Sequence, residues 1–227
     1  GGSDTVYGDD GFDSMWLDSN DTLSDLSAAE AAVGAGHVIH SFYQPYDEVV
    51  SMEIAGQNFE DPTVTNGAYV YKNFSSSPLF VGTPEMDDIN QGSVGDCYWL
   101  AGLGALADTD PELIEQSVTE LGDGTYAVRF YDNSFQEVYL RLDGDLPVRG
   151  PWSPPLSHAT PGHSGEIWAP ILEQAYAPHR SAADSYASPS RGWRSAVSPP
   201  VGGSSSSPSP LGGPTPANIA NPFAHHI

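Results

Sequence analysis

The feature that most restricts how this 227-residue chain can fold is a change in composition near Ala177. The part up to Ala177 holds 29 acidic and 4 basic residues among many short apolar runs, whereas the last fifty residues hold 1 acidic and 3 basic residues and nine of the 20 prolines. From about Val197 onward, serine, proline and glycine cannot bury enough apolar surface to offset the entropy of ordering the backbone. The composition therefore predicts a folded body followed by a disordered tail over residues 195–227.

Charge and cysteine content exclude several classes of protein. The net charge is −23 and the isoelectric point is near 4.1, so we expect no nucleic-acid partner, because such partners require a basic face. One cysteine excludes an intrachain disulfide framework and a zinc site built from several thiolates. No apolar run approaches the roughly 18 residues of a membrane span.

The first 22 residues contain a short repeat with a period of nine. The residue pairs that match are Gly2 and Gly11, Asp4 and Asp13, and Val6 and Met15. This spacing resembles the nonapeptide of RTX-type calcium-binding β-rolls, in which turn carboxylates and carbonyls surround an ion. The resemblance implies Ca²⁺ binding and secretion from a bacterium. One and a half copies would be poorly ordered alone, and the alternative is an acidic, glycine-rich coil with chance spacing.

Residues 23–78 are harder to assign and are treated as a linker region. The alanine-rich run from Leu23 to Val33 predicts a short helix, with Ser24 or Asp25 as its N-cap and with glycines ending it. His37 and His40 follow this run, but no carboxylate or third ligand accompanies them. That isolation favours a surface or helix-capping role for both histidines over metal ligation.

The segment from Gln91 to Cys97 is a polar, glycine-punctuated turn that leads into a small apolar helix, expected over Tyr98–Ala107. A thiol in the first turn of a helix faces free backbone N–H groups and the positive end of the helix dipole, which favour the thiolate. The Gln91 amide and the Cys97 backbone N–H would supply two donors to an oxyanion. The alternative is that Cys97 is an inert core residue.

The surrounding residues identify a family. The segment resembles the active-site run D-I-x-Q-G-x-x-G-D-C-W-x-L-A of calpains, which are papain-like cysteine proteases, and the matching residues are Asp88, Ile89, Gln91, Gly92, Gly95, Asp96, Cys97, Leu100 and Ala101. Tyr98 stands where the family prefers tryptophan. Downstream, alternating residues 125–131 and 136–142 predict a β-hairpin. Residues 166–177 (EIWAPILEQAYA) resemble the helix W-x-x-L-L-E-K-A-Y-A of that family.

The resemblance implies an α+β fold over residues 79–194, corresponding to the N-terminal subdomain of a papain-like core, with its helices and β-hairpin. It implies a calcium-dependent cysteine endopeptidase that cuts protein substrates, with Cys97 as nucleophile and Gln91 in the oxyanion hole. For Ca²⁺ it implies side-chain ligands Asp88 and Glu173 and backbone carbonyls of Val81 and Thr83. The alternative is a helix-capping Asp88 and a solvated Glu173.

Thiolate proteolysis also needs a histidine, usually oriented by an asparagine. In calpains these residues lie in G-H-A and N-P-W-like contexts, and neither context occurs in this chain. We therefore expect an incomplete catalytic domain that is inactive without a second protease subdomain. A different class of function stays open, a non-catalytic calcium-binding or adhesion module of an acidic secreted protein. The repeat favours secretion, whereas animal calpains are cytosolic.

Overall fold

The computed structural model of the chain describes residues 2–8, 10–11, 13–42, 59, 61–62, 69–92, 95–131, 135–149 and 160–180. The expected tail over residues 195–227 and the hairpin turn at residues 132–134 lie outside these ranges. The described part mixes helices with strands, as an α+β fold requires. None of its helices has the length and hydropathy needed to cross a membrane.

A three-stranded antiparallel sheet forms the centre of the fold, in the order β6 (Val118–Glu120), β7 (Thr125–Tyr131) and β8 (Glu137–Asp143). The predicted hairpin is confirmed, with pairs running from Thr125 opposite Asp143 to Tyr131 opposite Glu137. Because successive side chains of a strand point to opposite faces, Tyr126, Val128 and Phe130 share one face. These three residues join the main hydrophobic core.

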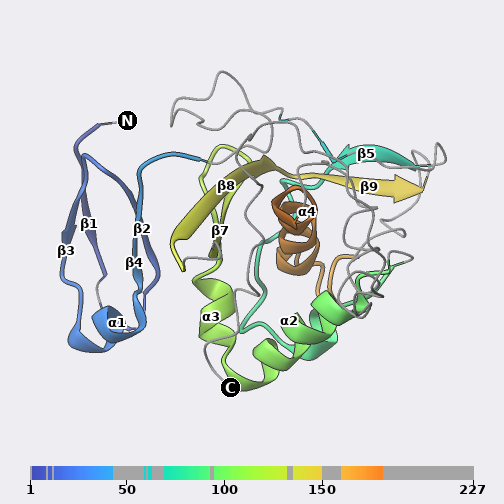
Figure 1. The fold of residues 1–227 in the computed structure, drawn as a ribbon, viewed down its shortest axis with the longest axis horizontal. Coiled ribbons are helices and arrows are strands. Elements are labelled where there is room, and N and C mark those ends of the chain that lie inside the picture. The colour runs from blue at the N-terminus through green and yellow to red at the C-terminus, as the bar shows by residue number, and fades with distance from the viewer. Residues whose placement is uncertain are drawn as a thin grey trace, which may run out of the picture.

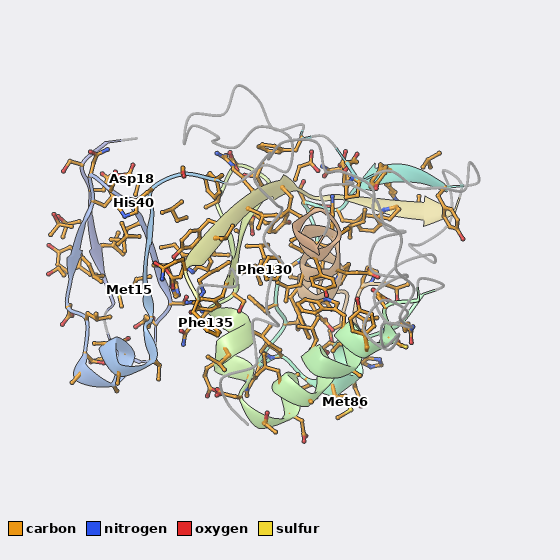
Figure 2. All side chains as sticks on the ribbon, viewed as in Figure 1. Met15, Asp18, His40, Met86, Phe130 and Phe135 are labelled. Atoms are coloured by element: carbon orange, nitrogen blue, oxygen red, sulfur yellow. The ribbon has the colours of Figure 1, made fainter. Side chains whose placement is uncertain are left out.

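Two helices cover that face of the sheet, α2 (Cys97–Thr109) and α4 (Trp168–Arg180) (Figure 1). Their buried residues complete the core around Phe130, which Figure 2 places between the sheet and the helices. The short helices η1 (Met86–Asp88) and α3 (Pro111–Glu115) flank α2. A separate antiparallel ribbon pairs β5 (Tyr69–Asn73) with β9 (Asp145–Arg149).

The N-terminal residues form a second unit of short parallel strands, β1 (Thr5–Tyr7), β2 (Met15–Asp18), β3 (Thr22–Ser24) and β4 (Gly36–Ile39). Strand β1 pairs with β3 and β2 pairs with β4, so each strand joins the next but one along the chain. The chain therefore coils through two turns. Met15 and Leu17 are buried within the coil, and Figure 2 shows Met15 inside this unit. We call β1–β4 and the intervening helix α1 (Ala28–Val33) the N-terminal unit.

Helix α1 starts five residues later than the alanine-rich run predicted. Its N-cap is Ser27, whose hydroxyl accepts a hydrogen bond from the Glu30 backbone N–H at 3.2 Å, while the Glu30 carboxylate accepts one from the Ser27 N–H at 2.7 Å. This capping box gives a stronger start signal than Ser24 or Asp25 could. Leu23 lies in β3 instead, so the expected boundary after residue 22 falls inside a strand. Gly34 ends the helix, as predicted, with φ 72°.

The N-terminal unit packs on the second face of the β7–β8 hairpin (Figure 1). Ile39 and Phe42 form a buried cluster with Ala127 and Tyr139, and Trp16 packs against it with its ring centroid 5.9 Å from that of Tyr139. Both faces of the hairpin are therefore covered, which explains why nearly all of β7 is buried. Docking on the sheet supplies apolar contacts that one and a half repeats lack by themselves.

His37 lies at the centre of this junction and is fully buried, so the surface role expected for it is wrong. The Arg129 guanidinium donates a hydrogen bond to His37 Nδ1 at 3.3 Å and another to Glu137 Oε1 at 3.0 Å. Burial, together with the positive charge of Arg129, lowers the pKa of His37 to about 4. The neutral imidazole thus accepts a hydrogen bond from buried Arg129, which is paired with the exposed Glu137. His40, three residues on, is exposed as expected.

Acid should weaken the fold through His37. Its folded pKa of about 4 lies below the ordinary value of 6.5, so the unfolded chain binds more protons between these values, and stability is lost as pH falls through this window. A pKa shift of this size lowers the free energy of unfolding by at most about 3 kcal/mol in acid. Denaturant titrations at pH 7 and 4.5 should show a smaller acid loss of unfolding free energy for His37→Gln than for the unaltered chain, and no such difference for His40→Gln. An equal acid loss in His37→Gln and the unaltered chain would contradict this assignment.

Candidate active site and cation site

Cys97 is the first residue of α2, and its side chain is an exposed free thiol. The first turn of α2 closes on the Asp96 carbonyl, which accepts hydrogen bonds from the N–H groups of Trp99 at 2.7 Å and Leu100 at 3.2 Å. The predicted helix is confirmed and extends two residues further, to Thr109. Residues on one side of α2 are buried in the core, whereas Cys97 and Ala101 face outward. The fold therefore presents the thiol at an accessible helix N-terminus.

An aromatic cluster holds the start of α2 against α4. The rings of Trp99 and Tyr176 stack in parallel planes with centroids 4.0 Å apart, and Phe130 meets Trp99 edge-on at 6.0 Å. Tyr98, the residue that departs from the family pattern, places its hydroxyl 3.5 Å from the hydroxyl of Tyr176. Aromatic pairs of this kind add roughly 0.5–1.5 kcal/mol beyond the area they bury. The substitution at position 98 thus changes the packing behind the thiol and leaves the thiol in place.

Asp96, directly before the nucleophile, has a fully buried side chain that makes no capping hydrogen bond to the helix. Burial raises the pKa of Asp96, and the neighbouring Glu173 side chain on α4 partly offsets this rise. Glu173 is itself buried, so the solvated alternative for Glu173 is wrong. Two acidic side chains therefore meet beneath the first turn of α2. Sequence reasoning missed this pair, since acidic residues so placed are usually exposed caps.

Gln91 lies at the start of the turn that leads to Cys97 and is exposed. It follows Asn90, whose carbonyl accepts a hydrogen bond from the Thr160 N–H at 3.0 Å in an isolated antiparallel bridge. This bridge ties the beginning of the turn to the segment that precedes α4. Residues 93–94, between Gln91 and the helix, lie outside the described ranges. The oxyanion role of Gln91 stays a prediction.

Three of the four residues expected to bind Ca²⁺ line one pocket. Val81, Thr83 and Asp88 surround a cavity of about 540 Å³, whose wall also includes Gly82, Glu85, Asp87, His163 and Ser164. Glu173 is not among the lining residues and lies next to Asp96 instead. The Asp88 carboxylate accepts a hydrogen bond from Trp168 Nε1 at 3.2 Å, which ties η1 to α4. It also accepts one from the Glu85 N–H at 2.9 Å and so caps η1, which confirms the helix-capping role given as the alternative for Asp88.

Glu166 is an acidic neighbour of this pocket that sequence reasoning did not single out. It is buried, it accepts a hydrogen bond from the Ser164 N–H at 3.1 Å, and burial together with nearby Asp88 raises its pKa. Across the described ranges, no three His, Cys, Asp or Glu side chains are grouped as metal ligands. An ion in this pocket would therefore draw on backbone carbonyls as well as Asp88, a donor set of oxygens that suits Ca²⁺.

Comparison with known proteins identifies the family of the chain. The family model described as calpain family cysteine protease matches residues 70–201, which is more than half of the chain. The chain is 33% identical over 109 residues to the calpain-type cysteine protease ADL1 of Oryza sativa subsp. japonica and 35% identical over 101 residues to the calpain-type cysteine protease DEK1 of Zea mays. It is 27% identical over 140 residues to a thiol protease of Porphyromonas gingivalis.

These matches cover 46%, 44% and 57% of this chain, but only 5%, 4% and 28% of the respective relatives. The matched region contains Cys97, Gln91 and the helix that carries Glu173. The motif, the α+β architecture and the family match agree: the chain belongs to the calpain family of cysteine proteases.

Proposed function

We propose that this chain contributes the nucleophile-bearing half of a calpain-type cysteine endopeptidase, with Cys97 as the attacking group. The observation that carries the proposal is the free, exposed thiol at the first residue of α2. At this position the sulfur can reach a substrate carbonyl without displacing the residues of α2 that pack in the core. The aromatic stack of Trp99 on Tyr176 anchors that turn, which keeps the sulfur in one place for attack.

The Cys97 sulfur would attack the carbonyl carbon of a peptide bond in a protein substrate, giving an acyl-enzyme that water then hydrolyses. The Cys97 N–H and the Gln91 amide would donate to the oxyanion during each step. A histidine must accept the thiol proton and return it to the leaving amine. No calpain-like histidine motif occurs in this sequence, so we infer that a second subdomain supplies it and that this chain alone is inactive.

Alkylation tests the state of Cys97 without requiring turnover. At neutral pH, iodoacetamide should label Cys97 of the folded chain at least as fast as in denaturant, because the thiol is exposed at the first residue of α2. Cys97 is the single cysteine, so the same measurement in denaturant provides a matched reference. A folded-state rate far below the rate in denaturant would show a shielded thiol and remove the basis for a nucleophile at this position.

We also propose that calcium binds at the pocket of Val81, Thr83 and Asp88. The residues fit an oxygen-ligated cation, because Asp88 and the carbonyl-bearing loop before it surround the same cavity and buried Glu166 adds negative charge beside it. A bound Ca²⁺ would supply positive charge to these carboxylates. Asp88 also holds Trp168, so the pocket is linked to the helix that supports Cys97. Glu173 would join the set only through a rearrangement of α4.

Substitution of aspartates inside and outside the pocket separates this pocket from general acidity. Ca²⁺ at about 100 times its dissociation constant should raise the unfolding free energy by about 2.7 kcal/mol. The gain should disappear in Asp88→Asn, which keeps an oxygen acceptor for Trp168, and should persist in Asp108→Asn, which changes an exposed carboxylate on α2 that does not line the pocket. Thermal unfolding with and without Ca²⁺ measures both variants. A calcium effect that survives in Asp88→Asn would place the ion elsewhere.

The parallel pairing of every second strand supports interpretation of residues 1–22 as a remnant of RTX-type repeats. This is the observation that favours the second candidate function, a calcium-binding or adhesion module of a secreted protein. The coil continues beyond residue 22 through β4, and its second turn contains helix α1. We propose secretion from a bacterium on the same basis, with a cytoplasmic location as the alternative.

A further inference from the structure

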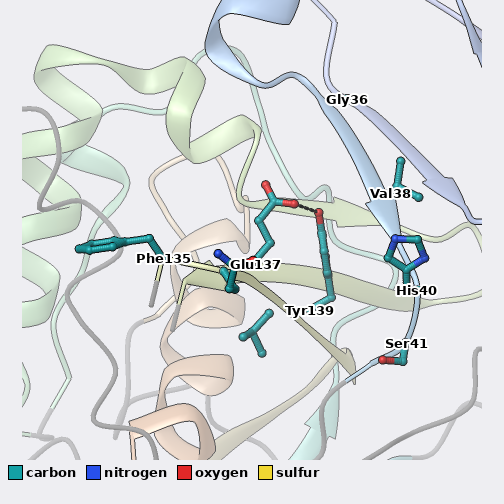
Figure 3. Close-up of a pocket in the computed structure, with 9 residues that line it drawn as sticks. Gly36, Val38, His40, Ser41, Phe135, Glu137 and Tyr139 are labelled. Atoms are coloured by element: carbon teal, nitrogen blue, oxygen red, sulfur yellow. Dashed lines mark hydrogen bonds between the residues drawn. The ribbon is translucent and has the colours of Figure 1, made fainter. Parts of the chain in front are cut away.

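A pocket lies where β4 and the residues after it meet the start of β8. The N-terminal unit and α2 lie on opposite faces of the hairpin (Figure 1). The volume of the pocket is about 610 Å³. Strand β4 and its exit line one wall, and the first residues of β8 line the other. In Figure 3, Phe135 lies at one end, Val38 and His40 lie at the other, and Glu137 and Tyr139 lie between them. We call this pocket the strand slot.

Two open strand edges meet at the strand slot. Within the described ranges β4 pairs only with β2, and β8 pairs only with β7, so each strand has one edge without a neighbour. An open edge presents a row of backbone N–H and C=O groups that an added strand can bind. The first three residues of β8, Glu137, Val138 and Tyr139, line the slot without a gap, as expected where a pocket follows the edge of a strand. The slot therefore matches the shape of an extended chain.

The side chains of the slot suit a segment with alternating character. Val38 is 41% exposed between buried His37 and Ile39, and Phe135 is 51% exposed at the other end. Between them the Tyr139 hydroxyl donates a hydrogen bond to Glu137 at 2.6 Å, which gives a polar centre. An extended segment places every second side chain on one face, so apolar residues can cover Val38 and Phe135.

The charge of the surroundings selects a basic segment. The first 42 residues contain eight acidic residues and no lysine or arginine. Asp18 lies beside β4, in register with Ile39, and Glu137 lies in the slot itself. The nearby Arg129 is buried and already bonded to Glu137 and His37. Lysine or arginine side chains that project from a bound strand would therefore meet a negative electrostatic potential.

We propose that the strand slot binds an extended, positively charged segment of a protein substrate as an added β-strand. That the bound segment belongs to a substrate rests on the proposed protease function. Binding of a basic segment to the slot does not depend on that function. A site on the opposite face of the sheet from Cys97 would hold the substrate and leave the thiol free for the scissile bond. Affinity would come from backbone pairing along the open edges, and selectivity from lysine and arginine side chains.

The test uses the full chain with Cys97 blocked by iodoacetamide and a fluorescein-labelled peptide of alternating lysine and valine. Fluorescence anisotropy at physiological ionic strength should show saturable binding. The same peptide with glutamate for lysine, or with alternate backbone amides methylated, should bind at least tenfold more weakly. Val38→Lys should weaken binding at least tenfold, whereas Val70→Lys, an equally exposed valine on β5, should leave it unchanged.

Circular dichroism of both variants checks that each is folded, and the methylated peptide tests the slot without altering the protein. Equal binding of the methylated peptide would overturn the proposal, because attraction by charge alone needs no backbone pairing. Equal weakening by Val38→Lys and Val70→Lys would overturn it too, since the effect would then not belong to the slot. Cys97 is blocked throughout, so failure of the protease proposal would appear in the alkylation rate and leave these outcomes intact.

Discussion

Burial of the β7–β8 hairpin on both faces is the constraint on which the rest of the structure depends. Tyr126, Val128 and Phe130 point into the helical core, and Ala127 and Arg129, one residue out of phase, point into the N-terminal unit. A one-residue slip in pairing would exchange these faces and place Arg129 in the apolar core. The hairpin register therefore determines both where the helices pack and where the N-terminal unit docks.

The candidate active site depends on this sheet through α2. The helix packs on the sheet with its apolar side, and the stack of Trp99, Tyr176 and Phe130 joins helix to helix and helix to strand at one point. Cys97 projects from the opposite side of the same turn. The side chain that meets the buried Asp96 beneath it is another acid, Glu173. Such a group is costly to bury, and the packing of α4 against α2 sustains it.

Several parts of this arrangement were predictable from local pattern. The alternating residues of 125–131 and 136–142 predicted the hairpin, and the apolar run after Cys97 predicted α2, because strand and helix periods appear directly in sequence. The match to the calpain motif identified the candidate nucleophile. Prediction failed at α1, where a capping box at Ser27 decided the helix start and Leu23 joined a strand. It also failed at His37, because nothing beside it in the sequence shows that Arg129 and Glu137 surround it.

The sequence by itself determined the β7–β8 hairpin, the helix that follows the Cys97 turn, and the family that the chain resembles, because these depend on neighbouring residues and on motif. Tertiary structure alone decided which faces are covered. Docking of the N-terminal unit makes His37 a buried neutral base and, within the described ranges, brings together at one pocket two strand edges that no other strand pairs with. It also places Asp88 at a pocket with Val81 and Thr83 while Glu173 lies beside Asp96. Burial and electrostatic environment arise from contacts between residues far apart in the chain, and the local sequence pattern does not predict these contacts.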